Sequence, residues 1–280
     1  MSEVRVAPNA GFCFGVERAV ELAVSAIEKG SGPVYTLGPI IHNPQVVERL
    51  REKGLMMAES LEEIQEGSVI IRSHGAPKGI IEEASSRNLK VIDATCPLVN
   101  RLKDRVMDLV SEGYKVVIVG DSDHPEVNAI LSFAGPQCFA VKNVEELLER
   151  NDLSGKVGLV AQTTQTLKNL QEVAAHLVIT CSEIRVYQTT CHSTNTRSAE
   201  AREMAREVDV MVVVGGKNSS NTRRLADAAA DEGATTYHIE SAEELAQLNL
   251  PKNCVFGVTA GASTPSWIID EVVSTLKSIG

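Results

Sequence analysis

Three of the six cysteines share one sequence context. Cys13, Cys96 and Cys191 each end a strand-like segment and open a helix-like one, and they recur at similar intervals along the chain. At the start of a helix, backbone N–H groups and the helix dipole stabilise a thiolate, which is the form that binds metal. Three thiolates that converge in the fold would suit an iron–sulfur cluster. With three protein ligands, one iron would stay open and could act as a Lewis acid and an electron donor.

The other cysteines, Cys138, Cys181 and Cys254, lack this context. We expect them to be small apolar residues without a role as ligands. No two of the six cysteines are close enough in the sequence to form a Cys-x-x-Cys pair, which excludes a zinc ribbon and the cysteine run of bacterial ferredoxins. Three unrelated buried cysteines remain the alternative explanation for the repeated context.

Polar loops recur in the same order as the cysteines. One kind of loop lies between a strand-like segment and an amphipathic helix, and a second kind closes each repeat. Small hydroxyl and amide residues at helix starts favour anion binding, although any single one could equally be an N-cap. Histidine can add positive charge near an anion. The loops therefore predict a diphosphate site, whose candidate residues are His42, His74, His124, Thr163, Ser219, Ser220, Asn221 and Ser263.

Glu126 is the candidate proton donor. It lies two residues after His124, in one of the predicted diphosphate loops. A carboxyl group that faces a bound diphosphate is stabilised in its protonated form, and it could then donate that proton. The alternative is a structural glutamate that the helix dipole favours in a first turn.

Strand-like and helix-like periods alternate along the chain, which is typical of α/β units around parallel sheets. Buried strands are expected at 116–120, 157–161, 210–215 and 255–258. The repeated loops divide the chain into three pseudo-equivalent α/β modules, residues 1–96, 97–190 and 191–280. Ligands of parallel α/β sheets bind outside the carboxyl ends of the strands. Three modules that face inward would bring the cysteines and loops to one central cavity.

The composition restricts the class of protein. The 280 residues carry 27 basic and 37 acidic side chains, for a formal charge of −10, without a cluster of lysine and arginine. This charge argues against binding to nucleic acid or to an anionic membrane. No apolar stretch reaches the length of a membrane-spanning helix, and Met-Ser-Glu-Val at the N-terminus does not begin a secretory signal. We therefore expect a cytoplasmic protein.

Together, the motifs resemble those of the 4-hydroxy-3-methylbut-2-enyl diphosphate reductase family, which performs the last step of the methylerythritol phosphate route to isoprenoids. The resemblance covers essentially the whole chain. The motifs that carry it are Gly-Phe-Cys13-Phe-Gly-Val, Leu-Gly-Pro-Ile-Ile-His42-Asn, Arg-Ser-His74-Gly, Asp-Ala-Thr-Cys96-Pro, His124-Pro-Glu126-Val, Gln-Thr163-Thr, Thr-Cys191, Gly-Lys-Asn-Ser219-Ser220-Asn221 and Thr-Ala-Gly-Ala-Ser263-Thr-Pro.

The resemblance implies a trefoil of three α/β modules around one [4Fe–4S] cluster, with Cys13, Cys96 and Cys191 as its ligands. It implies that the eight loop residues bind the substrate, chiefly its diphosphate, and that Glu126 supports protonation. The reaction so implied removes an allylic hydroxyl group with two electrons and two protons. Its products are isopentenyl diphosphate, dimethylallyl diphosphate and water.

The resemblance also implies a ferredoxin or flavodoxin as electron donor. These carriers are acidic, and an acidic chain needs a local basic patch to bind one. The candidates are Arg101, Lys103 and Arg105.

Two other functions remain open on the sequence alone. One is a three-cysteine iron–sulfur dehydratase of the quinolinate synthase type, which is also a three-module α/β protein. The other is a non-enzymatic iron–sulfur sensor or a zinc-stapled binding module. The Ser219-Ser220-Asn221 loop and Glu126 favour the reductase over the dehydratase.

Overall fold

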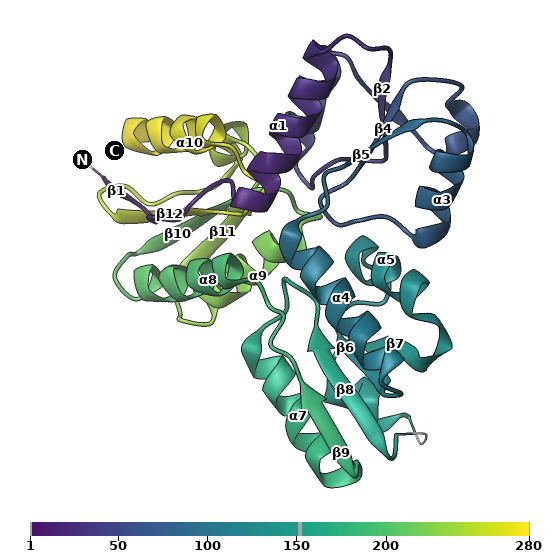
Figure 1. Ribbon diagram of the computed structural model, residues 1–280. Helices are drawn as coiled ribbons and strands as arrows, with labels where there is room; N and C mark the ends of the chain where they lie inside the picture. Colours follow the sequence, from purple (N-terminus) through teal and green to yellow (C-terminus); the bar gives the residue numbers. More distant parts are fainter. Residues whose placement is uncertain (1, 151–152, 280) are drawn as a thin grey trace. The chain divides into compact units, whose positions relative to one another are not determined.

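The computed structural model describes residues 2–150 and 153–279 (Figure 1). Its strands form three four-stranded sheets in which all neighbouring strands are parallel. Helices connect and cover these strands, which confirms the α/β class and the three modules. In the described part of the chain, no helix combines the length and apolar character needed to cross a membrane.

The first sheet has the strand order β3-β2-β4-β5. Its apolar core includes Val69 in the sheet, Leu61 in the 3-10 helix η1 and Ala84 in α3. The strands are β2 (Val34–Leu37), β3 (Leu55–Ala58), β4 (Ser68–Ile71) and β5 (Lys90–Asp93). The helices of this part of the chain are α1 (Phe14–Glu28), α2 (Pro44–Glu52), η1 (Leu61–Glu63) and α3 (Lys78–Ser86).

The second sheet has the order β7-β6-β8-β9 and is covered on both faces. Successive residues of a strand point to opposite faces, so Ile118 packs with α4 and α5, whereas Val117 packs with α6 and α7. The strands are β6 (Lys115–Val119), β7 (Cys138–Val141), β8 (Lys156–Ala161) and β9 (Glu183–Val186). The helices are α4 (Pro97–Ser111), α5 (Pro125–Ala134), η2 (Gly135–Gln137), α6 (Val144–Leu148) and α7 (Leu167–Thr180).

The third sheet has the order β1-β12-β10-β11. Val212 packs with α10, and Val213 on the opposite face packs with α8 and α9. The strands are β1 (Glu3–Val6), β10 (Val210–Val214), β11 (Thr235–Ile239) and β12 (Val255–Ala260). The helices are α8 (His192–Ala205), α9 (Ser220–Ala230), the 3-10 helix η3 (Ala242–Gln247) and α10 (Ser266–Ile279). The four strands expected from the sequence are thus present as β6, β8, β10 and β12.

The N-terminal strand β1 belongs to the third sheet, where Val4 lies opposite Phe256 of β12. It occupies the place that β5 and β9 hold in the other two sheets, beside the third strand of each module. Each cysteine of the repeated set therefore follows the strand at this same edge of a sheet. Residues 1–96 and 191–280 share one sheet, and the module boundaries at residues 96 and 190 stay a prediction.

The chain divides into two compact units. The first unit comprises residues 1–17, 41–50 and 192–280, and it contains the third sheet. The second unit comprises residues 18–40 and 51–191, and it contains the other two sheets.

Candidate active site

The three cysteines of the repeated set make the same backbone hydrogen bond. The N–H of Cys13 donates to the carbonyl of Ala262 at 3.1 Å, that of Cys96 to Ser73 at 2.9 Å, and that of Cys191 to Thr163 at 2.7 Å. Each acceptor lies in a polar loop that follows the neighbouring parallel strand. The carboxyl ends of parallel strands meet at one edge of a sheet, so cysteine and loop come together although they are distant in sequence.

Cys96 is the N-cap residue of α4, with Pro97 at the first helical position. The carboxylate of Asp93 accepts a hydrogen bond from the N–H of Thr95 at 2.9 Å and so orders the preceding turn. Arg18 donates to the carbonyl of Thr95 at 3.1 Å and to that of Asp93 at 3.2 Å. Hydrogen bonds to its backbone therefore hold the segment that leads into Cys96.

Cys13 precedes α1, and its carbonyl accepts hydrogen bonds from the N–H groups of Val16 and Glu17. The side chain of Arg197, only 4% exposed, donates to the carbonyl of Gly11 at 2.8 Å and to that of Phe12 at 3.4 Å. Arg197 and Arg18 support cysteine loops but were not predicted from the sequence. Each lies in the helix that follows a cysteine of the repeated set, Arg197 six residues after Cys191 and Arg18 five after Cys13, and this placement is the signal that could have found them.

The three cysteines are divided between the two units, with Cys13 in the first and Cys96 and Cys191 in the second. Within either unit, the residues that the structure describes hold no group of three His, Cys, Asp or Glu side chains that could bind a metal ion. All three thiols are half-buried and unbridged. Thiolates at helix starts are ligands that iron–sulfur clusters prefer, so the donor set fits such a group.

Glu126 lies in the second unit and is bound by Thr163. Its two carboxylate oxygens accept hydrogen bonds from the backbone N–H and from the hydroxyl group of Thr163, both at 2.7 Å. The backbone N–H of Glu126 donates to Nδ1 of His124, the N-cap residue of α5, at 3.1 Å. The rings of His74 and His124 meet edge to face with centroids 5.7 Å apart. Four predicted site residues thus form one cluster, in which His124, Glu126 and Thr163 are buried and His74 is half-buried, and Thr163 links it to Cys191.

His42 and the remaining predicted residues lie in the first unit. The hydroxyl of Ser263 donates to the carbonyl of His42 at 3.1 Å, so these two loops are in direct contact. Gly216 lies against the same carbonyl, because a Cβ atom there would come within 2.6 Å of it. Ser219 is the N-cap residue of α9 and accepts a hydrogen bond from the N–H of Thr222, as the alternative N-cap explanation predicts.

Asn221 is the strongest structural sign of a ligand in this unit. It is 6% exposed, yet neither oxygen nor nitrogen of its side-chain amide has a hydrogen-bond partner among the described residues. Native proteins rarely bury a polar group without a partner, because the lost hydrogen bonds to water are not replaced. A polar ligand would satisfy both atoms. Ser220, beside it, is half-buried at the start of α9.

The other cysteines differ from the repeated set as expected. Cys138 is buried in the core of the second sheet, where burial raises the pKa of its thiol to about 12. Cys254 is half-buried beside the carbonyl of Pro251, and burial also raises its pKa. Cys138 is the first residue of β7 and Cys254 directly precedes β12, so neither stands at the start of a helix as the repeated set does.

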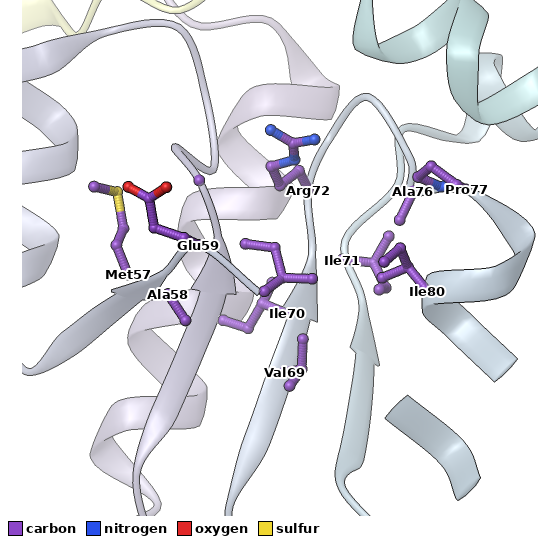
Figure 2. A pocket seen from close by; sticks show the side chains of 12 residues that line it. Met57, Ala58, Glu59, Val69, Ile70, Ile71, Arg72, Ala76, Pro77 and Ile80 are labelled. Carbon is purple, nitrogen blue, oxygen red and sulfur yellow. The ribbon is translucent and has the colours of Figure 1, made fainter. Parts of the chain in front are cut away.

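A separate cavity of about 510 Å³ opens at the ends of β2, β3 and β4 in the second unit. Figure 2 shows Arg72 rising beyond the end of β4 and Glu59 beyond the end of β3, above an apolar floor that includes Ile70. Burial lowers the pKa of Arg72. Gly38 (φ +73°) leaves room for the guanidinium, since a Cβ there would be 3.2 Å from Nη1 of Arg72. None of the predicted site residues lines this cavity.

The model of the LytB protein family matches residues 4–277 of the chain. The chain belongs to this family. Among curated family members, 4-hydroxy-3-methylbut-2-enyl diphosphate reductase of Geotalea daltonii is 47% identical over 99% of the chain and 98% of its own length. That of Geobacter sulfurreducens is 48% identical over 98% of the chain and 97% of its own length.

Solved LytB structures show the same fold. A structure of (E)-4-hydroxy-3-methyl-but-2-enyl diphosphate reductase, the terminal enzyme of the non-mevalonate pathway, is 43% identical, covers both chains fully and has a TM-score of 0.73. The E-1-hydroxy-2-methyl-but-2-enyl-4-diphosphate reductase of Plasmodium falciparum is 26% identical over 99% of the chain and 88% of its own, with a TM-score of 0.92. Membership of the LytB family favours the reductase over the dehydratase and the sensor.

Proposed function

We propose that this protein reduces 4-hydroxy-3-methylbut-2-enyl diphosphate to isopentenyl diphosphate and dimethylallyl diphosphate in isoprenoid biosynthesis. Two electrons and two protons are consumed; the allylic C–O bond breaks, a C–H bond forms, and the oxygen leaves as water. The observation that carries the proposal is the identity of 47% with a curated reductase over 99% of the chain. The motifs around the cysteines and polar loops support it residue by residue.

Cys13, Cys96 and Cys191 would hold one [4Fe–4S] cluster, leaving one iron without a protein ligand. When bound, such a cluster supplies electrons one at a time and a Lewis-acidic iron. The equivalent backbone hydrogen bonds of the three cysteines support a shared role. Arg18 and Arg197 would keep two of the three cysteine loops in place while the cluster is bound.

The substrate's diphosphate would bind to the polar loops that the sequence predicts. The residues that would bind it are His42, His74, His124, Thr163, Ser219, Ser220, Asn221 and Ser263. The unsatisfied amide of Asn221 supports this assignment, because it could accept from a hydroxyl and donate to a phosphate oxygen. Hydrogen bonds to a charged group are the strong ones, so few are needed to hold the anion.

Glu126 would hold and deliver a proton. Its side chain is 2% exposed, and both of its oxygens are oriented by Thr163. Burial excludes bulk water from this carboxyl group, so the proton that it passes on would reach the substrate and not the solvent. Delivery to one or the other end of the allylic carbon chain accounts for the two products.

The electron donor in this proposal is a carrier of the ferredoxin or flavodoxin type, and the place of the reaction is the cytoplasm. The proposed division of the chain into three modules, 1–96, 97–190 and 191–280, places Cys13 in the first module, Cys96 at the junction of the first and second, and Cys191 at the start of the third. Strand β1 pairs with β12, so the segment before Cys13 belongs to the first module by sequence but completes the sheet of the last module.

The deciding experiment is anaerobic purification with iron and sulfide counting, followed by turnover on the hydroxylated diphosphate with a reduced dye. We expect close to four irons and four sulfides per chain for one cubane cluster, and substrate-dependent dye oxidation. Zinc in place of iron would indicate a stapled binding module. An intact cluster without turnover would indicate a sensor, and turnover on quinolinate precursors alone would indicate the dehydratase.

A further inference from the structure

A second hollow of about 450 Å³ lies in the second unit at the start of α4. Three arginines line it, Arg18 from α1 and Arg101 and Arg105 from α4, with Asp104 as the one acidic side chain in its lining. Thr95 and Pro97, the residues on either side of Cys96, lie in the same lining. The hollow is therefore a positively charged feature beside a predicted cluster ligand.

The charge of this hollow is opposite to that of the whole protein. The chain has a formal charge of −10, whereas the hollow combines three guanidinium groups with one carboxylate. An acidic protein would be repelled by most of such a chain, and a local basic area would direct its approach to this one place. Charge complementarity of this kind sets orientation and association rate more than affinity.

Contacts with the surrounding residues hold two of the arginines in place. The guanidinium of Arg18 donates to the carbonyls of Thr95 and Asp93, so it lies one residue from Cys96. That of Arg105 lies over the ring of Tyr187, 5.1 Å from its centroid, and Nη1 is 3.4 Å from Asp108. Cations that are already ordered lose little side-chain entropy when a partner's carboxylates bind.

Arg101 is the arginine that is left for a partner. It is exposed, and its side chain makes no hydrogen bond or ion pair within the part of the chain that the structure describes. Lys103, one of the residues expected from the sequence, instead lies over the ring of Phe133 at 5.0 Å and bonds to Asn100 at 3.3 Å. The basic surface thus consists of Arg18, Arg101 and Arg105.

We propose that this arginine hollow is the docking surface for an acidic one-electron carrier protein. The inference rests on the proposed function, because the reductive reaction proposed there consumes electrons that a carrier must deliver. The carrier would present carboxylates to Arg101 and Arg105 and place its redox centre beside the loop of Cys96. Electron-transfer complexes are small and short-lived, and a hollow of this size with charged walls suits that class better than a broad apolar face.

The test compares two electron sources on the cluster-loaded protein. Turnover on 4-hydroxy-3-methylbut-2-enyl diphosphate is driven either by a reduced acidic plant-type ferredoxin or by dithionite-reduced methyl viologen, which needs no docking surface. The variant is Arg101→Glu/Arg105→Glu. A matched control, Lys168→Glu/Lys252→Glu, makes the same change of charge at two exposed lysines that lie outside the hollow.

We expect the reversal in the hollow to raise KM for ferredoxin roughly tenfold or more and to leave dye-driven turnover unchanged. The control should shift KM for ferredoxin less than about threefold. Arg101→Lys/Arg105→Lys keeps the positive charges, so its KM should stay close to that of the parent protein. In the parent protein, ferredoxin-driven turnover should fall as ionic strength rises from about 0.05 M to about 0.5 M, because salt screens exposed charges. Dye-driven turnover should fall much less.

Three results would overturn the docking surface: an equal KM shift in the control, no salt dependence with ferredoxin, or a parallel loss with ferredoxin and with dye. The last result would place the arginines in the active site. If the parent protein reduced the substrate with neither donor, the proposed function would fail instead. A titration of oxidised ferredoxin onto parent and variant would still decide whether the hollow binds it.

Discussion

Thr163 holds both carboxylate oxygens of Glu126, one through its backbone N–H and one through its hydroxyl group, at 2.7 Å each. The same Thr163 accepts the backbone hydrogen bond of Cys191 through its carbonyl. One residue therefore fixes the orientation of the candidate proton donor and the position of a candidate cluster ligand. This relationship makes the polar loop after β8 the centre of the site in the second unit.

Replacing Glu126 by Gln should abolish proton delivery while the shape of the side chain is kept. We expect the cluster to assemble and turnover to fall roughly 10²–10⁴-fold, the usual worth of a positioned acid. Removal of negative charge near a diphosphate should leave binding unchanged or slightly tighter. Single-turnover kinetics on the reduced protein measures the effect. Glu145→Gln, an exposed first-turn glutamate of α6, is the matched control. Turnover of the Glu126 variant within a factor of three of the parent would remove the proton-delivery role.

Replacement of Cys13, Cys96 or Cys191 by Ser should strip or degrade the cluster, because a hard hydroxyl group is a poor iron ligand beside a thiolate. Iron content and visible absorbance after anaerobic reconstitution measure the loss. Cys181→Ser, a half-buried cysteine outside the repeated context, should keep normal absorbance. Bleaching by Cys181→Ser, with none by Cys96→Ser, would show that the repeated context does not mark the ligands.

Asn221→Leu should separate stability from binding. It removes two buried polar atoms that have no partner among the described residues, so we expect the substrate-free protein to melt at the same or a higher temperature. Binding of the diphosphate should weaken by about 1.5–3 kcal/mol, the value of a hydrogen bond to a charged group. Scanning calorimetry measures the melting temperature, and titration calorimetry measures the affinity for the diphosphate. The control is Asn218→Leu, because Asn218 is an exposed residue of the same loop. A marked drop in melting temperature with unchanged affinity would assign Asn221 a structural role.

Arg197→Met should loosen the loop that carries Cys13. The change leaves the carbonyls of Gly11 and Phe12 without their donor, for a loss of about 2–4 kcal/mol in the free energy of unfolding. We also expect the variant to lose its cluster to an iron chelator faster than the parent protein does. An unfolding experiment alone would not measure this rate. Arg206→Met removes an exposed ion pair with Glu232 and should cost less than about 1 kcal/mol. If the chelator removed iron equally fast from the parent and from the Arg197 variant, Arg197 would contribute to the stability of the fold but not to retention of the cluster.

The sequence by itself determined the α/β class, the three repeats and the candidate site residues. Local spacing carries this information: apolar periodicity marks strands and helices, and a cysteine between a strand and a helix is visible without any long-range contact. The place of Cys138 in an apolar core was also predictable, because Cys138 does not lie between a strand and a helix. Family motifs such as His124-Pro-Glu126 are short and contiguous, and so they too are visible in the chain.

The tertiary structure alone decided which loop meets which cysteine. Cys13 bonds to Ala262, Glu126 to Thr163 and Arg197 to Gly11, pairs that lie far apart in the chain. The place of β1 in the third sheet is of the same kind. Hydrogen bonds between distant segments leave no period in the sequence, because they depend on which parallel strands become neighbours and thus on which loops share a sheet edge.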